Sequence, residues 1–181
     1  MSEVPAWFER KFNFTLAPAQ YPNVRVRLWG TPARLEEMFQ GVHREALIAK
    51  PEGKWSAQEH AGHLLDLEPL WLSRIEDFFA VSGVLTAADL SNRKTDEAGH
   101  NHRALSGILT DFRAARRALL ARADARQPGS NDRTIEHPRL KQPMRLIDHL
   151  YFVAEHDDHH LARICELLRA GHGAVVVESN P

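Results

Sequence analysis

The sequence predicts an all-α protein, a four-helix bundle with a long crossover between its third and fourth helices. Four segments carry apolar residues at helical spacing and are bounded by residues that start or stop helices, whereas alternating strand patterns are almost absent. The chain has 181 residues, of which 43% are hydrophobic, and this is enough to bury one sizeable core. We therefore expect residues 1–181 to form a single bundle domain.

The first predicted helix runs from about Thr31 to Lys50. Thr31 is a suitable N-cap, and Pro32 would occupy the first helical position, where its missing N–H costs nothing. The preceding stretch, residues 17–31, holds two prolines and alternates three apolar residues with arginines. This pattern predicts a short extended piece before the helix.

The second predicted helix runs from about Ser56 to Val81 and is stopped by Gly83. It opens with Ser56-Ala57-Gln58-Glu59, which has the spacing of a capping box. In this motif the serine hydroxyl and the glutamate carboxylate each bind a free backbone amide of the first turn. The helix start is therefore well defined.

The third predicted helix spans about Thr95 to Ala123, with Arg113, Arg116 and Arg117 on its solvated side. The fourth begins after Pro143 and ends before Gly171. Between them, residues 126–142 are rich in Pro, Gly, Asn and Asp, which interrupt helices. This segment is the predicted crossover.

Composition excludes several classes of function. The formal net charge is −1, so no general positive field exists to hold nucleic acid. No window approaches the roughly 20 apolar residues of a membrane span, and the N-terminus does not resemble a secretory signal. Cys165 is the only cysteine, which excludes an internal disulfide framework and a cysteine zinc cluster. A cytoplasmic location is expected.

Histidine is the unusual feature of the composition. Five of the 11 histidines fall between His137 and His160. On the fourth helix, His156 and His160 are four residues apart, which places their Cβ atoms about 5–6 Å from each other on one face. Two such imidazoles can chelate one metal ion. His159 points to the far side of the helix and is expected in solvent, whereas His149 is expected to pack in the core.

A chelating pair needs a third ligand from another helix, and the second helix offers His60 and His63. Its apolar face contains His60, while His63 lies roughly 100° to the side of that face. Periodicity alone therefore favours His60.

Three motifs resemble those of the DinB-like superfamily of metal-binding four-helix bundles. They are the Trp55-Ser56 that opens a helix, the later His63-Leu64-Leu65-Asp66, and the late His156-Asp157-Asp158-His159-His160. The resemblance extends from about Arg34 to Leu168. It implies that His63, His156 and His160 hold the metal, with His60 as the alternative to His63.

Three neutral imidazoles leave one position of a tetrahedral ion open, which is typical of a site that performs chemistry. We expect a divalent metal ion, with zinc or nickel first and iron left open, because imidazole ligands are compatible with all three. The resemblance implies a metal-dependent hydrolase or a small-thiol S-transferase that acts on a small molecule. No catalytic residue is identified by the sequence. The alternative is a metal- or small-ligand-binding protein of the stress response without turnover.

Other candidate residues have more ordinary interpretations. Asp66 is expected to be exposed, although it could orient an imidazole. Glu68 and Asp157 fall near apolar faces, so one of them is expected to bind a ligand histidine or an arginine. Cys165 is expected to be a small buried hydrophobe. A homodimer seam is predicted from the apolar N-terminal residues, which could equally pack on their own bundle: Trp7, Phe8, Phe12 and Phe14.

Overall fold

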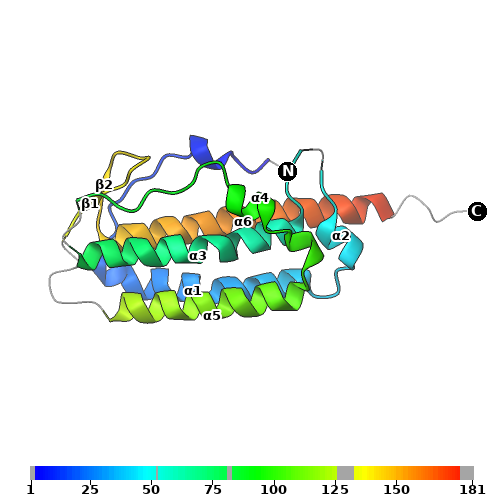
Figure 1. Cartoon of the computed structure of the whole chain (residues 1–181), viewed down its shortest axis with the longest axis horizontal. Coiled ribbons are helices and arrows are strands. Elements are labelled where there is room, and N and C mark those ends of the chain that lie inside the picture. The colour runs from blue at the N-terminus through cyan, green and yellow to red at the C-terminus, as the bar shows by residue number, and fades with distance from the viewer. Residues whose placement is uncertain (1–2, 52, 81–82, 126–132, 176–181) are drawn as a thin grey trace, which may run out of the picture.

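Four long helices form the body of the protein (Figure 1). The computed structural model describes residues 3–51, 53–80, 83–125 and 133–175. Both α1 (Tyr21–Phe39) and α3 (Ala57–Phe79) pack against α5 (Leu105–Asp124) and α6 (Leu146–Val175), so α1 and α3 occupy opposite corners of the bundle. The predicted four-helix bundle is confirmed.

The helices run in pairs of the same direction, α1 with α6 and α3 with α5 (Figure 1). Because α3 and α5 are parallel, the connection between them returns along the bundle, and its residues 83–104 contain α4 (Arg93–Glu97) and the 3-10 turn η3 (His100–His102). The predicted crossover between α5 and α6 contains a small antiparallel sheet of β1 (Ile135–Glu136) and β2 (Pro143–Met144). Of the three connections between the four long helices, the first also holds a short helix, within residues 40–56.

Helix α1 differs from its prediction. It begins at Tyr21, so the segment predicted to be extended is helical, and Pro32 lies inside the helix and not at its start. Pro32 lacks the N–H that would bind the Leu28 carbonyl one turn earlier. The structure replaces this bond, because Nη1 of Arg116 donates to the Leu28 carbonyl at 3.0 Å. The chain after Phe39 leaves the helix and forms the separate short α2 (Arg44–Ile48).

The other helix boundaries agree with the sequence at some ends only. The capping box is confirmed, since Ser56 Oγ accepts from the Glu59 amide at 3.1 Å and Glu59 Oε2 accepts from the Ser56 amide at 2.9 Å. Thr95 does not begin α5. It lies in α4, and Gly99, at a φ of 61°, helps to separate α4 from the helix that starts at Leu105. At the other end of the chain, α6 continues past Gly171 to Val175.

Arg116 was expected in solvent but is almost completely buried, with 1% of its surface exposed. Its Nη2 donates to Glu68 Oε1 at 2.6 Å, and its Nη1 donates to Asp157 Oδ2 at 2.5 Å. Asp157 also accepts from the Thr31 hydroxyl at 2.8 Å. The expectation that a carboxylate near the apolar face binds an arginine is confirmed for both carboxylates. All four long helices meet at this ion cluster.

The N-terminal segment lies along the face formed by α3 and α6 (Figure 1). Trp7, Phe12 and Phe14 pack against the core of their own bundle, whereas Phe8 is 55% exposed. Three of the four residues considered for a dimer seam therefore cover the chain's own helices. Among the residues described, no helix is both long and apolar enough to cross a membrane.

Candidate metal centre

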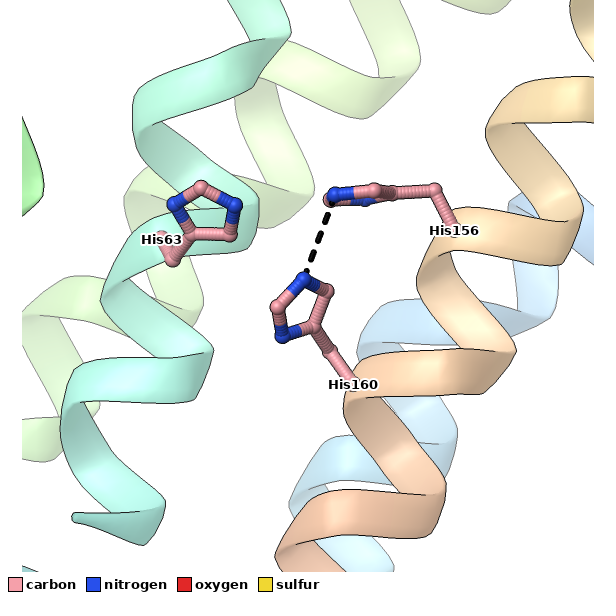
Figure 2. Close-up of side chains that lie close together, drawn as sticks. All are labelled: His63, His156 and His160. Atoms are coloured by element: carbon pink, nitrogen blue, oxygen red, sulfur yellow. Dashed lines mark hydrogen bonds between the residues drawn. The ribbon is translucent and has the colours of Figure 1, made fainter. Parts of the chain in front are cut away.

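Two neighbouring helices bring three histidines together (Figure 2). His63 on α3 faces His156 and His160, which project from successive turns of α6. The Nε2 atoms of His156 and His160 are 3.2 Å apart, and the ring centroids of His63 and His160 are 4.7 Å apart. One nitrogen from each ring lies within 4.8 Å of the other two. The structure thus groups the same three histidines that the family resemblance implied.

The three rings are buried, with exposed fractions of 3%, 4% and 6% for His63, His156 and His160. Burial disfavours the charged imidazolium, so it lowers the pKa of His63 to about 4. The same cause holds the pKa of His156 and of His160 well below the usual value for histidine. All three rings are therefore neutral at pH 7, which is the form that binds metal ions.

His60 lies beside this cluster and not within it. Its Nδ1 is 2.8 Å from Nδ1 of His160, so one of these two nitrogens carries a proton and donates to the other. If His160 is the donor, its Nε2 is left as a lone pair that points toward His156. His60 then fixes the tautomer of a ligand candidate, as residues behind metal ligands commonly do.

His63 is held by a second hydrogen-bond chain, which comes from the connection between α3 and α5. Its Nδ1 donates to the Thr95 hydroxyl at 2.9 Å, and that hydroxyl donates to Asp66 Oδ2 at 3.0 Å. The same oxygen accepts from His100 Nε2 at 2.7 Å. Although burial alone would raise it, these donors hold the pKa of Asp66 below its ordinary value. The exposed aspartate expected from the sequence is therefore wrong, because Asp66 is partly buried. It acts on His63 through the Thr95 hydroxyl.

Gly62 makes this arrangement possible, and its replacement tests it. A Cβ atom at Gly62 would lie 2.2 Å from the His100 ring. We expect Gly62→Ala to displace His100 and to lower the free energy of unfolding by about 1–3 kcal/mol, measured by urea denaturation. Gly107→Ala is the control, because a Cβ there meets nothing within 4 Å. Equal stability of the two variants would contradict the packing described.

The histidine cluster opens onto a cavity of about 980 Å³, which is within the usual range for small-molecule sites. Trp55 lies on one side, with its ring centroid 4.6 Å from that of His63. Trp7 and Trp71 lie on the other, at 5.0 and 5.4 Å from His156. His159 also lines the cavity and is partly buried under Trp7, so its predicted exposure to solvent is wrong.

The remaining candidates lie outside the cluster. His149 is fully buried in the core, with its Nε2 3.4 Å from the Trp71 carbonyl. Cys165 is partly buried and does not line the cavity. Arg163 lines the cavity but pairs with Glu166 at 2.9 Å. Thr95 and His100 were missed by the sequence analysis, because no local pattern indicates that a distant connection packs against His63.

The donor set fits a divalent metal ion. Two nitrogens that bind one tetrahedral zinc ion at 2.0–2.1 Å lie roughly 3.3 Å apart, which is close to the distance between Nε2 of His156 and Nε2 of His160. His63 and His160 use Nδ1 for hydrogen bonds to residues outside the cluster, and Nε2 of His160 faces Nε2 of His156 at 3.2 Å. Nδ1 of His156 has no partner among the described residues. Neutral imidazoles suit zinc or nickel.

Comparison with known proteins agrees with this architecture. The sequence model of the DinB superfamily matches residues 27–164. The solved structure of YfiT from Bacillus subtilis, described as a probable metal-dependent hydrolase with an unusual four-helix bundle topology, is similar to this chain with a TM-score of 0.76. The match covers 91% of this chain and 94% of that chain at 21% sequence identity. No curated protein sequence matches the chain.

Proposed function

The chain belongs to the DinB superfamily, and from this premise we propose that it is a metal-dependent enzyme that acts on a small molecule. His63, His156 and His160 would hold one divalent ion, zinc or nickel. The observation that carries the proposal is the buried cluster of three neutral imidazoles at the base of a large cavity. A structural zinc would normally have four protein ligands, so a three-histidine set favours a reactive site.

The chain's own residues prepare this site in three ways. Thr95 and His60 hold the rings of His63 and His160 through Nδ1. Three tryptophans that contact the histidine rings form apolar walls of the cavity beside the cluster. His159 lines the cavity as a further imidazole, and burial lowers its pKa to about 4, so it is a neutral base at pH 7. A divalent ion bound there supplies a Lewis acid that activates water or a thiol.

Two reactions are compatible with this chemistry, hydrolysis and transfer of a small thiol. The description of YfiT as a probable metal-dependent hydrolase supports the first. His159, a base that lines the cavity, favours an enzyme. The alternative is a stress-response protein that only binds a metal or small ligand. Hydrolysis of an aryl ester by the zinc- or nickel-loaded protein would support a hydrolase, and reaction of an aryl halide with a small thiol would support a thiol transferase. Activity in neither assay would support the protein that only binds.

The metal content of purified variants tests the ligand set. We expect about one divalent ion per chain in the wild-type protein and a loss of stoichiometric binding in His63→Ala, His156→Ala and His160→Ala. Elemental analysis after dialysis against metal-free buffer measures this. Full metal content in His156→Ala and His160→Ala would overturn the assignment.

His60→Ala is the matched control, because His60 touches the cluster without belonging to it. We expect this variant to keep its ion with an affinity weakened roughly 10- to 100-fold, the usual effect of removing a group behind a ligand. Competition with a chromogenic chelator measures the affinity. Loss of the ion in His60→Ala together with its retention in His63→Ala would make His60 the ligand.

A further inference from the structure

Two arginines line the cavity without a carboxylate partner among the described residues: Arg74 and Arg139. Arg74 is only 2% exposed, and its Nε donates to the Thr86 carbonyl at 2.8 Å. Asp77, the carboxylate that acts on Arg74 electrostatically, is occupied by the amide and hydroxyl of Thr86. A buried cation that no carboxylate contacts directly is costly, so its retention calls for an explanation.

Arg139 adds a second unsatisfied cation to the same wall of the cavity. Its Nη2 is buried and has no hydrogen-bond partner in the described part of the chain. Burial, together with a smaller repulsion from Arg139, lowers the pKa of Arg74 to about 10. Arg163 differs from both, since it lines the cavity but is neutralised by Glu166.

His137 completes the cluster and shows which kind of atom is missing from it. The backbone amides of Arg139 and Leu140 both point to Nδ1 of His137 at 3.2 Å, so Nδ1 is the lone-pair nitrogen and Nε2 carries the proton. That Nε2–H lies 3.2 Å from Nη1 of Arg74, which is also a donor. Two N–H groups that face each other in a buried site are both satisfied by an acceptor placed beside them.

We propose that Arg74, Arg139 and Nε2–H of His137 form an oxyanion-binding subsite, which takes the carboxylate or phosphate group of the substrate. Arginine is well suited to such groups because its donors match two oxygens at once. Trp71 lies between this subsite and the histidine cluster, with its ring centroid 5.4 Å from that of His156 and 5.3 Å from Cζ of Arg74. Its Nε1–H, also buried, has no acceptor among the described residues.

The role of this subsite in catalysis rests on the proposed function, and it narrows the substrate to a class. The molecule carries an anionic group at one end and its reacting group at the other, with an apolar part against Trp71 between them. Anion binding itself needs only the arginine cluster. The two proposals can therefore fail separately.

The test is calorimetric titration of the protein as purified with benzoate and phenyl phosphate, and with benzyl alcohol as the neutral analogue. We expect at least one anion to bind, and its dissociation constant to rise about tenfold or more in Arg74→Met and in Arg139→Gln. The two anions distinguish a carboxylate from a phosphate ligand. Metal content, measured in parallel, should be unchanged in both variants, so a failed metal assignment does not affect the result.

Arg163→Gln is the matched control, because it removes a paired cation from the same cavity. We expect it to bind the anion within about twofold of the wild-type protein, since its charge is already neutralised. Weakening equal to that of Arg139→Gln would mean a general charge effect and overturn the proposal, as would equal binding of benzyl alcohol or no binding of either anion.

Thermal unfolding separates a binding role for Arg74 from a structural one. If Arg74 is kept for a ligand, Arg74→Met removes a buried charge that no carboxylate contacts, and the variant should melt at the wild-type temperature or above it. A marked fall in the melting temperature, or failure to fold, would make Arg74 structural. Anion binding by Arg139→Gln then tests the subsite independently. Arg139 is only partly buried, so its replacement should disturb the fold less.

Discussion

Replacement of Arg116 with leucine is expected to lower the free energy of unfolding by about 3–5 kcal/mol. The change leaves the carboxylates of Glu68 and Asp157 buried without their cation, and both side chains are at most 2% exposed. It also removes the donor to the Leu28 carbonyl, which Pro32 leaves without its helical partner. Since whole domains are commonly stable by 5–15 kcal/mol, much of the fold's stability would be lost. Urea denaturation followed by circular dichroism measures the effect.

The neighbouring Arg117 supplies the control for this experiment. Arg117→Leu removes the same charge from an exposed position on the same helix, and we expect a change within about 0.5 kcal/mol. Adding Glu68→Leu and Asp157→Leu to Arg116→Leu should restore part of the loss, because the unpaired carboxylates are then gone. Equal stability of Arg116→Leu and Arg117→Leu would show that the ion cluster does not hold the helices together.

The sequence predicted the parts of this structure that depend on local chemistry. Ser56 and Glu59 mark a helix start because both partners of the capping box lie within one turn. His156 and His160 share a face because their spacing is that of a helix, and both line the cavity. The preference for His63 over His60 as a metal ligand rests on the family resemblance, because periodicity alone favours His60. It stays a prediction.

The features that the sequence missed depend on partners far along the chain. Pro32 normally marks a helix start, but here Arg116 from α5 binds the carbonyl that the proline leaves free. The sequence predicted Arg116 to lie in solvent, because the periodicity of one helix gives no information about residues on other helices. Glu68 on α3 and Asp157 on α6 neutralise it. Thr95 was placed in a long third helix, whereas it belongs to the return connection that reaches His63.

The metal-free protein is expected to lose several kcal/mol of stability between pH 7 and pH 5. Burial lowers the pKa of His60 to about 3 and that of His63 to about 4. In the unfolded chain both return to about 6.5. Below that value the unfolded state binds protons that the folded state does not, so stability is complete above pH 6.5 and falls as the pH drops toward 4. At pH 5, protonation of each of these two histidines in the unfolded chain lowers the free energy of unfolding by about 2 kcal/mol.

His156 and His160 act in the same direction, because burial also lowers the pKa of each. His60→Gln should therefore reduce the dependence of stability on pH, since glutamine does not titrate. His102→Gln, which changes an exposed histidine, should leave that dependence unchanged. Urea denaturation of the chelator-treated protein at pH 7, 6 and 5 measures the slope, and equal stability at all three would contradict the neutral, buried histidines described.

A bound ion should oppose this loss, because it binds only the folded arrangement of neutral imidazoles. We expect the zinc-loaded protein to melt at a higher temperature than the chelator-treated protein at pH 7, and to unfold at a lower pH during acid titration. The difference in melting temperature should disappear once acid has released the ion, and His156→Ala should show no difference at any pH. If zinc changed neither the melting temperature nor the acid midpoint of the wild-type protein, the three histidines would not be a metal site. The proposed metal-dependent enzyme would then lose its chemical basis. The oxyanion subsite at Arg74 and Arg139 would not be affected, because anion titration tests it separately.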